Sequence, residues 1–186
     1  RQERDLMLEL AAQLGAAGLE VPVVSIGSTP TITVIDHLNG IDEARPGNYI
    51  FFDAFQASMG SCSMDDCALT VLAAVVHRDL LRSKVVIDAG AIALSKDRGA
   101  VEFDAACGYG QVLDLEGNAL GLRVESLSQE HGEIIVTNGS GIERLKVGTR
   151  VRILANHSCL TAAQHSYYNV LDHGEIIDRW EIQRGW

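Results

Sequence analysis

Six short apolar segments in the second half of the chain restrict its fold more than any other feature. They cover residues 84–88, 110–114, 120–127, 133–137, 151–155 and 175–182. Glycine together with asparagine or aspartate separates several of them, at residues 116–118, 138–141 and 172–174, and these residues favour tight hairpin turns. Short strands joined by such turns predict an antiparallel barrel or sandwich.

The first part of the chain has a different pattern. Apolar residues at three- and four-residue steps predict an amphipathic helix over residues 4–18, and a β-branched strand is predicted over 19–26. Residues 33–38 fit a helix or a strand. A strand is expected at 49–52 and another within the apolar run 67–81. We therefore expect an α/β part at residues 1–54 and a β-rich part at residues 55–186.

Two turns in the α/β part have the composition of anion-binding loops. Gly27-Ser28-Thr29 follows the predicted strand 19–26, and small residues with hydroxyls at the carboxyl end of a strand are typical of ligand sites in α/β folds. Gly47 and Asn48 form the second turn, and their backbone N–H groups are expected to point out of a strand end. The two turns could share one phosphate group. The alternative is a pair of plain turns, which glycine, serine and asparagine also form.

A pair of possible metal ligands follows the segment 151–155. If that strand continues, His157 and Cys159 lie on the same side of it, about 7 Å apart along the chain. Imidazole and thiolate donors favour zinc over magnesium or calcium, and two protein ligands leave positions open for water or substrate. The alternative is an ordinary hydrogen-bonded histidine near a small buried cysteine.

The composition excludes several classes of function. The 186 residues are 47% hydrophobic and 22% charged, which is typical of a globular protein. A formal charge of −10 argues against nucleic acid as a partner, because phosphate binding requires clustered lysine and arginine. No apolar run reaches membrane-spanning length and no signal-peptide core is found, so no membrane partner is expected. The four cysteines form no CxxC pair, which is typical of reduced thiols and indicates a cytoplasmic protein.

Six motifs carry a resemblance to one enzyme family. They are residues 25–31 (SIGSTPT), 45–49 (RPGNY), 88–90 (DAG) with 94–95 (LS) and 97–99 (DRG), 128–132 (SQEHG), 156–159 (NHSC) and 180–185 (WEIQRG). In this order they are similar to motifs of the D-threonine aldolase and D-serine dehydratase family, pyridoxal-phosphate enzymes whose fold resembles that of alanine racemase. The resemblance covers nearly the whole chain and corresponds to the C-terminal half of such an enzyme. It implies the last βα units of a TIM-like barrel, followed by an antiparallel β-barrel or sandwich domain.

The resemblance assigns a cofactor site to the first part of the chain. Thr29, Gly47 and Asn48 match positions that hold the phosphate of pyridoxal 5'-phosphate, and Ser28 stands beside them in the same turn. Arg45 matches an arginine that meets the cofactor ring; the alternative is an exposed arginine before a turn.

A metal site is implied for the second part. His157 and Cys159 match the positions that hold the catalytic metal, Zn²⁺ or Mn²⁺. A cysteine at the second position is typical of the zinc dehydratase branch, and an aspartate of the aldolase branch. His131 is expected to be a third neighbour of the metal or a proton carrier; the alternative is a loop histidine with an ordinary hydrogen bond.

The family also has requirements that this chain does not meet alone. The lysine that binds the cofactor covalently lies early in the barrel of these enzymes, and Lys84, Lys96 and Lys146 match no such context. We therefore expect activity only together with an N-terminal half that carries this lysine. The resemblance further implies a homodimer.

The sequence thus yields three hypotheses for function. The first is a metal-assisted, pyridoxal-phosphate-dependent lyase that acts on a D-3-hydroxy amino acid as D-serine dehydratase does, with a 2-oxo acid and ammonia as products. The second is an aldolase that cleaves D-threonine or 3-hydroxyaspartate to glycine and an aldehyde or 2-oxo acid. The third is a non-enzymatic β domain that binds a metal or a partner, for the case that the chain is complete as given.

Overall fold

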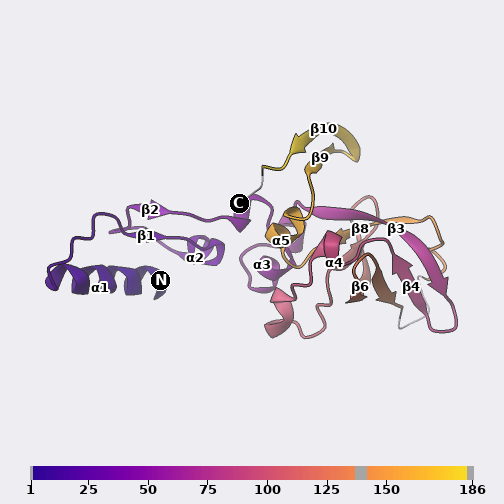
Figure 1. The fold of residues 1–186 in the computed structure, drawn as a ribbon, viewed down its shortest axis with the longest axis horizontal. Helices are drawn as coiled ribbons and strands as arrows, with labels where there is room; N and C mark the ends of the chain where they lie inside the picture. Colours follow the sequence, from indigo (N-terminus) through magenta and orange to yellow (C-terminus); the bar gives the residue numbers. More distant parts are fainter. Residues whose placement is uncertain (1, 137–141, 184–186) are drawn as a thin grey trace.

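The computed structural model of the chain describes residues 2–136 and 142–183. One end of the molecule holds α1 (Gln2–Ala16), β1 (Ser25–Ile26), α2 (Thr29–Val34) and β2 (Glu43–Ala44), and the other end holds a β-barrel (Figure 1). No helix within the described ranges has both the length and the apolar character needed to cross a membrane. The turn predicted at 138–141 lies outside the described residues.

The elements before residue 45 confirm the helix and shorten the strand. Helix α1 forms as expected, but none of its residues is buried, and Leu6 and Leu10 are 56% and 47% exposed. Only the last two residues of the predicted strand 19–26 form β1, which pairs in parallel with β2. Residues 29–34 form α2, where the Ser28 hydroxyl accepts a hydrogen bond from the Thr31 N–H at 3.2 Å and caps the helix.

The strand predicted at residues 49–52 is wrong. The 3-10 helix η1 (Asn48–Ile50) stands there instead, because the N–H groups of Phe51 and Phe52 both donate to the carbonyl oxygen of Asn48, at 3.1 and 2.8 Å. Tyr49 and Ile50 are exposed. The apolar residues of this segment therefore form a turn, and α3 (Ala54–Ser58) and η2 (Met64–Asp66) follow.

Six antiparallel strands form a closed barrel in the order β3-β4-β7-β6-β5-β8, which confirms the predicted class of fold. The apolar run 67–81 contains the longest of them, so the choice of a strand there is also confirmed. Register shifts in three of the strand pairs mark the irregularities that accompany curvature. The strands are β3 (Thr70–Asp79), β4 (Lys84–Ile87), β5 (Gln111–Leu113), β6 (Ala119–Leu127), β7 (Gly132–Ile135) and β8 (Arg150–Leu154).

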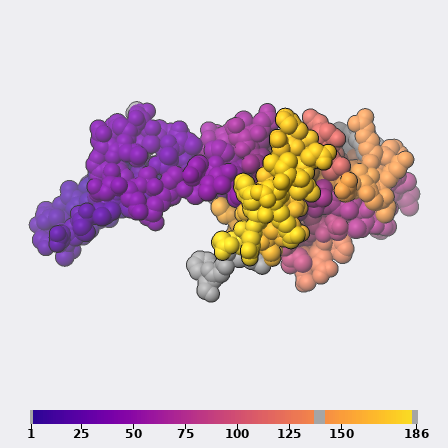
Figure 2. Space-filling model, turned by 90° about the horizontal axis from the view of Figure 1, so that it is seen from above, coloured from indigo at the N-terminus to yellow at the C-terminus, as the bar shows by residue number. Residues whose placement is uncertain are grey.

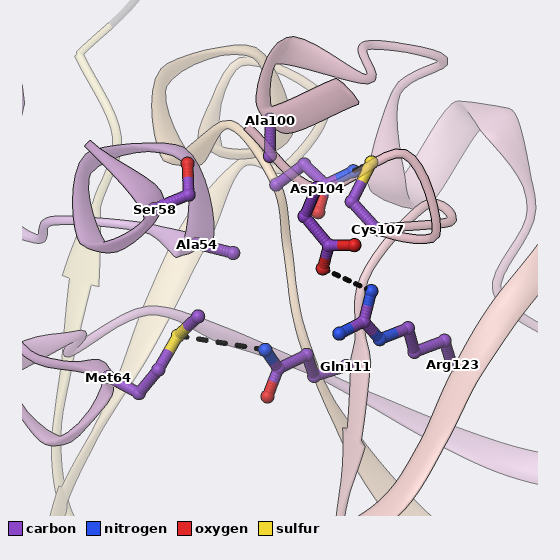
Figure 3. A pocket seen from close by; sticks show the side chains of 9 residues that line it. Ala54, Ser58, Met64, Ala100, Asp104, Cys107, Gln111 and Arg123 are labelled. Carbon is purple, nitrogen blue, oxygen red and sulfur yellow. Dashed lines mark hydrogen bonds and ion pairs between the residues drawn. The ribbon is translucent and has the colours of Figure 1, made fainter. Parts of the chain in front are cut away.

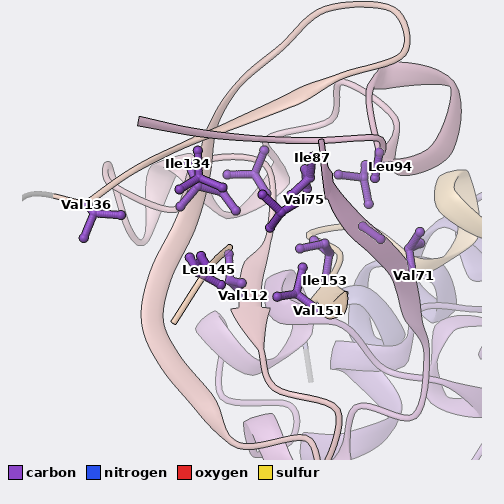
Figure 4. Close-up of a cluster of buried hydrophobic side chains, with 14 of the residues drawn as sticks. Val71, Val75, Ile87, Leu94, Val112, Ile134, Val136, Leu145, Val151 and Ile153 are labelled. Carbon is purple, nitrogen blue, oxygen red and sulfur yellow. The ribbon is translucent and has the colours of Figure 1, made fainter. Parts of the chain in front are cut away.

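The barrel encloses the hydrophobic core. In β4 the residues alternate between partly exposed and buried, as a strand with one face in the core requires. Val85, Ile87, Ile134 and Ile153 have no exposed surface and belong to one hydrophobic cluster in the barrel interior, in which Figure 4 labels Ile87, Ile134 and Ile153. Burial of each such side chain contributes about 1.5–3 kcal/mol relative to its exposure.

The strand predicted at 175–182 forms, but it is not part of the barrel. β10 (Glu175–Glu181) pairs with β9 (Tyr167–Asp172) in a separate antiparallel hairpin, and every residue of β10 is exposed. This hairpin forms the yellow ridge across the face shown in Figure 2.

Short helices surround the end of the barrel where Thr70 of β3 pairs with Leu154 of β8. The chain enters this end from α3 and leaves it through α5 (Ser158–Ala162), while α4 (Ala91–Leu94) and η3 (Gly99–Glu102) follow β4. The Thr161 hydroxyl donates to the Leu94 carbonyl at 3.0 Å and joins α5 to α4. The predicted site residues after position 150 lie on these connections.

Candidate functional site

The two predicted anion turns lie next to each other. They follow β1 and β2, which pair in parallel, and the Arg45 N–H donates to the Ile26 carbonyl at 2.8 Å. The Tyr49 N–H then donates to the hydroxyl of Thr29 at 3.1 Å, and Thr29 is only 4% exposed. The carboxyl ends of parallel strands are where ligands bind in α/β folds.

Gly47 and Asn48 are the members of these turns with open backbone donors. In the described part of the chain, neither of their N–H groups donates a hydrogen bond. A Cβ atom at Gly47 would meet nothing within 4 Å, so the surface in front of this residue is open. We call residues 45–49 the cofactor turn. With the hydroxyl proton of Thr29, it offers several donors to one anion.

Ser28 is placed differently. Its hydroxyl oxygen caps α2 and lies 3.4 Å from the carboxylate of Glu3, which also accepts from the Gly27 N–H at 3.3 Å and from the Thr31 hydroxyl. A carboxylate of α1 thus occupies this side of the turn, which shows that it accommodates an anion. The donors left open for a second anion are those of Thr29, Gly47 and Asn48.

Arg45 points along the strands. Its Nε donates to the Ser25 hydroxyl at 2.8 Å and lies 3.1 Å from the Glu43 carboxylate. Its side chain is 64% exposed. In this structure the arginine is therefore held by β1 and β2.

The predicted continuation of β8 to Cys159 is wrong. β8 ends at Leu154, His157 is the N-cap residue of α5, and Cys159 lies in the first turn of that helix. The chain turns here because the Thr161 N–H donates to the His157 carbonyl at 3.1 Å. His157 keeps extended backbone angles, and two residues separate the Cα atoms by at most about 7 Å. We call residues 156–159 the metal loop.

Asp97 fixes the imidazole of His157. The carboxylate oxygen Oδ2 of Asp97 lies 2.5 Å from Nδ1 of His157, and the two side chains are about one third exposed, at 30% and 29%. The Asp97 N–H in turn donates to the hydroxyl of Ser95 at 3.2 Å. A carboxylate on one ring nitrogen leaves Nε2 as the nitrogen that can bind a metal, which is a common arrangement at zinc sites.

The metal loop and the cofactor turn meet at Asp53. Its carboxylate accepts from the Asn48 side-chain amide at 2.6 Å, from the Ser158 N–H at 2.8 Å and from the Gln56 N–H at 2.9 Å. The amide nitrogen of Asn48 also lies 3.8 Å from the sulfur of Cys159, whose side chain is exposed. Two sites predicted separately therefore adjoin, although Asn48 lies 110 and 111 residues before Ser158 and Cys159 in the sequence.

Tyr168 of β9 is a further neighbour of this region. Its ring lies 5.1 Å from that of Phe51, centroid to centroid. Burial, and then the charge of the nearby Cys159, raise the pKa of the Tyr168 hydroxyl above its ordinary value. The hydroxyl is a hydrogen-bond donor at neutral pH, as an ordinary tyrosine hydroxyl is.

The other cysteines are poorly suited to metal binding. Burial, and next the neighbouring Cys62, raise the pKa of the Cys67 thiol to about 12, whereas the thiolate is the form that binds metals. Cys107 is buried. Within residues 2–136 and 142–183, no group of three or more histidine, cysteine, aspartate or glutamate side chains could hold a metal ion.

The described contacts place His131 beside α4. Its N–H donates to the Ser128 hydroxyl at 3.2 Å, its carbonyl accepts from the Ser128 N–H at 2.9 Å, and the residue is exposed. Residues 128–131 form a turn, which we call the Ser128 turn, and the carbonyl of Ser128 accepts a hydrogen bond from the N–H of Ala91 at the start of α4. None of these contacts reaches His157, and the role predicted for His131 near the metal stays a prediction.

A small cavity of about 20 Å³ is lined by residues of α3, of η3 and of the start of the metal loop (Figure 3). Asp104, Cys107, Gln111, Arg123 and Asn156 are among its lining residues. This volume holds one water molecule and no cofactor or substrate. The Asn156 side chain donates to the Gly108 carbonyl at 2.8 Å beside it and anchors the start of the metal loop.

Sequence reasoning missed Asp53, Asp97 and Tyr168. Asp53 lies 105 residues before Ser158, Asp97 lies 60 residues before His157, and Tyr168 lies 9 residues after Cys159. No local spacing in the sequence indicates these contacts. Asp53 did carry one local signal, since an aspartate before a short helical segment is a typical N-cap. Asp97 lies in a motif that was noted only for its resemblance to a family.

Comparison with known proteins finds relatives with assigned names. The chain is 40% identical over its full length to the D-threo-3-hydroxyaspartate dehydratase of Delftia sp. (strain HT23) and 36% identical over 94% of its length to the D-serine dehydratase of Dictyostelium discoideum. It covers 50% and 46% of these proteins, so it spans about half the length of the curated relatives it matches.

Solved structures show the same fold. A histidine-to-alanine mutant of D-threo-3-hydroxyaspartate dehydratase superposes with a TM-score of 0.89 at 40% identity, over 99% of this chain and 49% of that one. A D-threonine aldolase from Filomicrobium marinum superposes with a TM-score of 0.69 at 26% identity, over 95% of this chain and 45% of that one. The predicted class, βα units followed by an antiparallel barrel, is that of these enzymes.

The family match lies in the barrel and the metal loop. The family is described as "Putative serine dehydratase domain", and its match covers residues 68–171, more than half of the chain. The named relatives above at 36–40% identity are dehydratases, which are lyases. The chain belongs to this serine dehydratase domain family.

Proposed function

We propose that the chain is the metal-binding part of a pyridoxal-phosphate-dependent dehydratase that acts on a D-3-hydroxy amino acid such as D-serine or D-threo-3-hydroxyaspartate. The reaction removes the Cα proton and the β-hydroxyl group, and hydrolysis of the dehydrated product gives a 2-oxo acid and ammonia. The observation that carries the proposal is the junction of the cofactor turn with the metal loop at Asp53. Membership in the family and the names of the relatives support it.

The cofactor turn fits the phosphate of pyridoxal phosphate. Thr29, Gly47 and Asn48 offer a hydroxyl and two open N–H groups at the carboxyl ends of two parallel strands, and a phosphate is an acceptor of such donors. When bound, the cofactor supplies an electron sink that makes the substrate Cα–H acidic. Arg45 is proposed to reach the cofactor ring only after leaving Glu43. Ser28 is proposed to shape the turn by capping α2.

The metal loop fits a zinc ion. His157 offers Nε2 while Asp97 holds Nδ1, and Cys159 offers an exposed thiol, so the donor pair is nitrogen and sulfur. When bound, zinc supplies a Lewis acid for the β-hydroxyl of the substrate. Solved structures of D-threo-3-hydroxyaspartate dehydratase include a mutant of a histidine and a mutant of the cysteine two positions later, the latter in the metal-free form. His157 and Cys159 have the same spacing.

Other groups of the chain have supporting roles in this proposal. The hydroxyl of Tyr168 can donate a hydrogen bond next to Cys159. His131 is exposed and can carry protons without contacting the metal or the substrate. Lys84 is bound to Glu133 on the barrel at 2.8 Å, which fits the expectation that another part of the complete protein provides the lysine for the cofactor.

The test uses the complete protein encoded by the gene, loaded with pyridoxal phosphate and zinc. Incubation with D-serine and with D-threo-3-hydroxyaspartate is expected to release a 2-oxo acid and ammonia in equal amounts. Neither L-serine nor a sample treated with a chelator should react. Formation of glycine and acetaldehyde from D-threonine, without any 2-oxo acid from the other two substrates, would refute the dehydratase.

The aldolase is the second candidate because D-threonine aldolase shares this fold over 95% of the chain. Its lower identity, 26% against 40% for the dehydratase, favours the dehydratase. The sequence-based hypothesis placed 3-hydroxyaspartate with the aldolase, whereas the relative that acts on this substrate is named a dehydratase.

A further inference from the structure

One buried carboxylate joins the cofactor turn to the metal loop. Asp53 is 1% exposed, and its oxygen Oδ2 accepts two hydrogen bonds, from Nδ2 of Asn48 at 2.6 Å and from the N–H of Ser158 at 2.8 Å. Ser158 is the residue between the two proposed metal ligands. A single oxygen atom therefore touches a residue of each proposed site.

Backbone contacts make this junction stiff. The N–H groups of Ala54 and Phe55 donate to the carbonyls of Ala155 and Asn156 at 3.3 and 3.2 Å, so the segments before α3 and before α5 are joined residue by residue. The other oxygen of Asp53 accepts from the Gln56 N–H at 2.9 Å and caps α3. The carboxylate cannot follow one partner without straining its bonds to the others.

Asp53 also fixes the orientation of the Asn48 side chain. A carboxylate that accepts from the backbone N–H groups of Ser158 and Gln56 requires the nitrogen end of the Asn48 amide to face it. The oxygen end of Asn48 then lies buried, with no hydrogen-bond partner among residues 2–136 and 142–183. A buried oxygen without a partner costs free energy. The hydrogen bond to Asp53 offsets this cost, so the position of the Asn48 side chain depends on where Asp53 lies.

We propose that Asp53 is a positioning residue that couples the two sites, so that zinc on the metal loop tightens binding of pyridoxal phosphate at the cofactor turn. This inference rests on the proposed function. A metal that fixes His157 and Cys159 fixes the peptide of Ser158 between them. Through Asp53 it also fixes Asn48, so the cofactor then meets a turn that is already ordered. Linkage requires the reverse effect to be equally large.

The experiment measures cofactor affinity in the complete protein. Apoprotein is titrated with pyridoxal phosphate, once with saturating zinc and once with a chelator, and the ratio of the two dissociation constants is the coupling factor. We expect tighter binding with zinc by about fivefold or more, within the usual range of coupling between sites. Titration of zinc with and without pyridoxal phosphate must give the same factor.

Two variants test the role of Asp53. Asp53→Asn keeps the shape but replaces one of the two acceptor oxygens by an NH2 group, so the donors of Asn48, Ser158 and Gln56 can no longer all be satisfied, and the coupling factor is expected to fall toward one. Asn48→Ala removes the other end of the bridge but keeps the backbone N–H that is proposed to bind the phosphate. Because the coupling factor is a ratio measured within one variant, it is expected to fall to about one in Asn48→Ala whatever the absolute affinity for pyridoxal phosphate, even if Asp53→Asn folds poorly. Asp114→Asn is the matched control, because Asp114 also accepts from a backbone N–H and an asparagine amide, both of Asn118, but in a barrel hairpin.

The outcomes are distinct. A factor of one in the wild type, with both ligands bound, would overturn the coupling and leave the proposed function intact. An undiminished factor in Asn48→Ala would overturn the role of the bridge. Absence of binding of either ligand to the wild type would overturn the proposed function together with this inference. A coupling factor that falls to about one in Asp53→Asn and Asn48→Ala, and that stays at the wild-type value in Asp114→Asn, supports the proposal.

Discussion

Replacement of Asp97 by asparagine is expected to weaken zinc binding while the fold is kept. The carboxylate oxygen lies 2.5 Å from Nδ1 of His157 and holds the tautomer that leaves Nε2 free for the metal. An asparagine can instead donate to Nδ1, which places the ring proton on Nε2 and blocks the metal-binding nitrogen.

The size of the effect follows from the geometry. A hydrogen bond to a charged group contributes about 1.5–3 kcal/mol, and the lower half of this range applies because both side chains are about one third exposed and partly screened by water. This corresponds to an increase of about 10- to 50-fold in the dissociation constant of zinc. Losses of this size are typical of residues that orient a metal ligand.

The assay is a competition titration with a chromophoric zinc chelator on the complete protein. Asp79→Asn is the control, because Asp79 accepts from the Arg82 N–H at 3.0 Å in the distant turn between β3 and β4. Thermal unfolding of the zinc-free variants should coincide with that of the wild type within a few degrees. Unchanged zinc affinity in Asp97→Asn would refute the reasoning, as would an equal loss in the control.

Three further predictions concern the barrel. Gly90→Ala should destabilise the protein by about 1–3 kcal/mol in urea unfolding, because its Cβ would lie 2.4 Å from backbone atoms of the Ser128 turn; an unchanged midpoint would contradict the packing described. Ile134→Ala should cost about 2–5 kcal/mol, since this side chain is fully buried, whereas Ile135→Ala, at 44% exposure, should cost less than half as much; equal losses would place the core elsewhere. The hydrogen bond from Arg123 lowers the pKa of Asp104, so its contribution to stability is present above the unfolded-state pKa near 4 and is lost as the pH falls through the lower folded-state pKa. Arg123→Met should therefore weaken the decline of stability below about pH 4, by less than about 1 kcal/mol at this partly exposed pair; an identical pH profile would argue against the pair.

The sequence predicts the barrel well because its strands have one face in the core. The alternation of buried and partly exposed residues in β4 and the buried residues of β8 follow directly from the pleat of a strand. The same pattern says nothing about which strands pair. β10 therefore appeared to belong with the barrel strands, although the structure pairs it with β9 in a hairpin outside the barrel.

The site was predictable only where its residues are neighbours in sequence. His157 and Cys159 are predicted as metal ligands from their spacing, and the expected strand geometry is replaced by the start of α5. Asp97 and Asp53 act across 60 and 105 residues, and only the folded chain brings them to the metal loop. The open N–H groups of Gly47 and Asn48 were expected at a strand end, and they occur at a 3-10 helix instead.

The most direct test of the proposed function is the rate of 2-oxo acid formation from D-serine or D-threo-3-hydroxyaspartate by metal-free complete protein, loaded with pyridoxal phosphate and titrated with zinc. We expect no product without zinc and a rate that rises to a plateau at one zinc ion per chain, with no rise in His157→Ala. A full rate without zinc would contradict the role of the metal loop. Absence of 2-oxo acid from both substrates at any zinc concentration would contradict the proposed dehydratase.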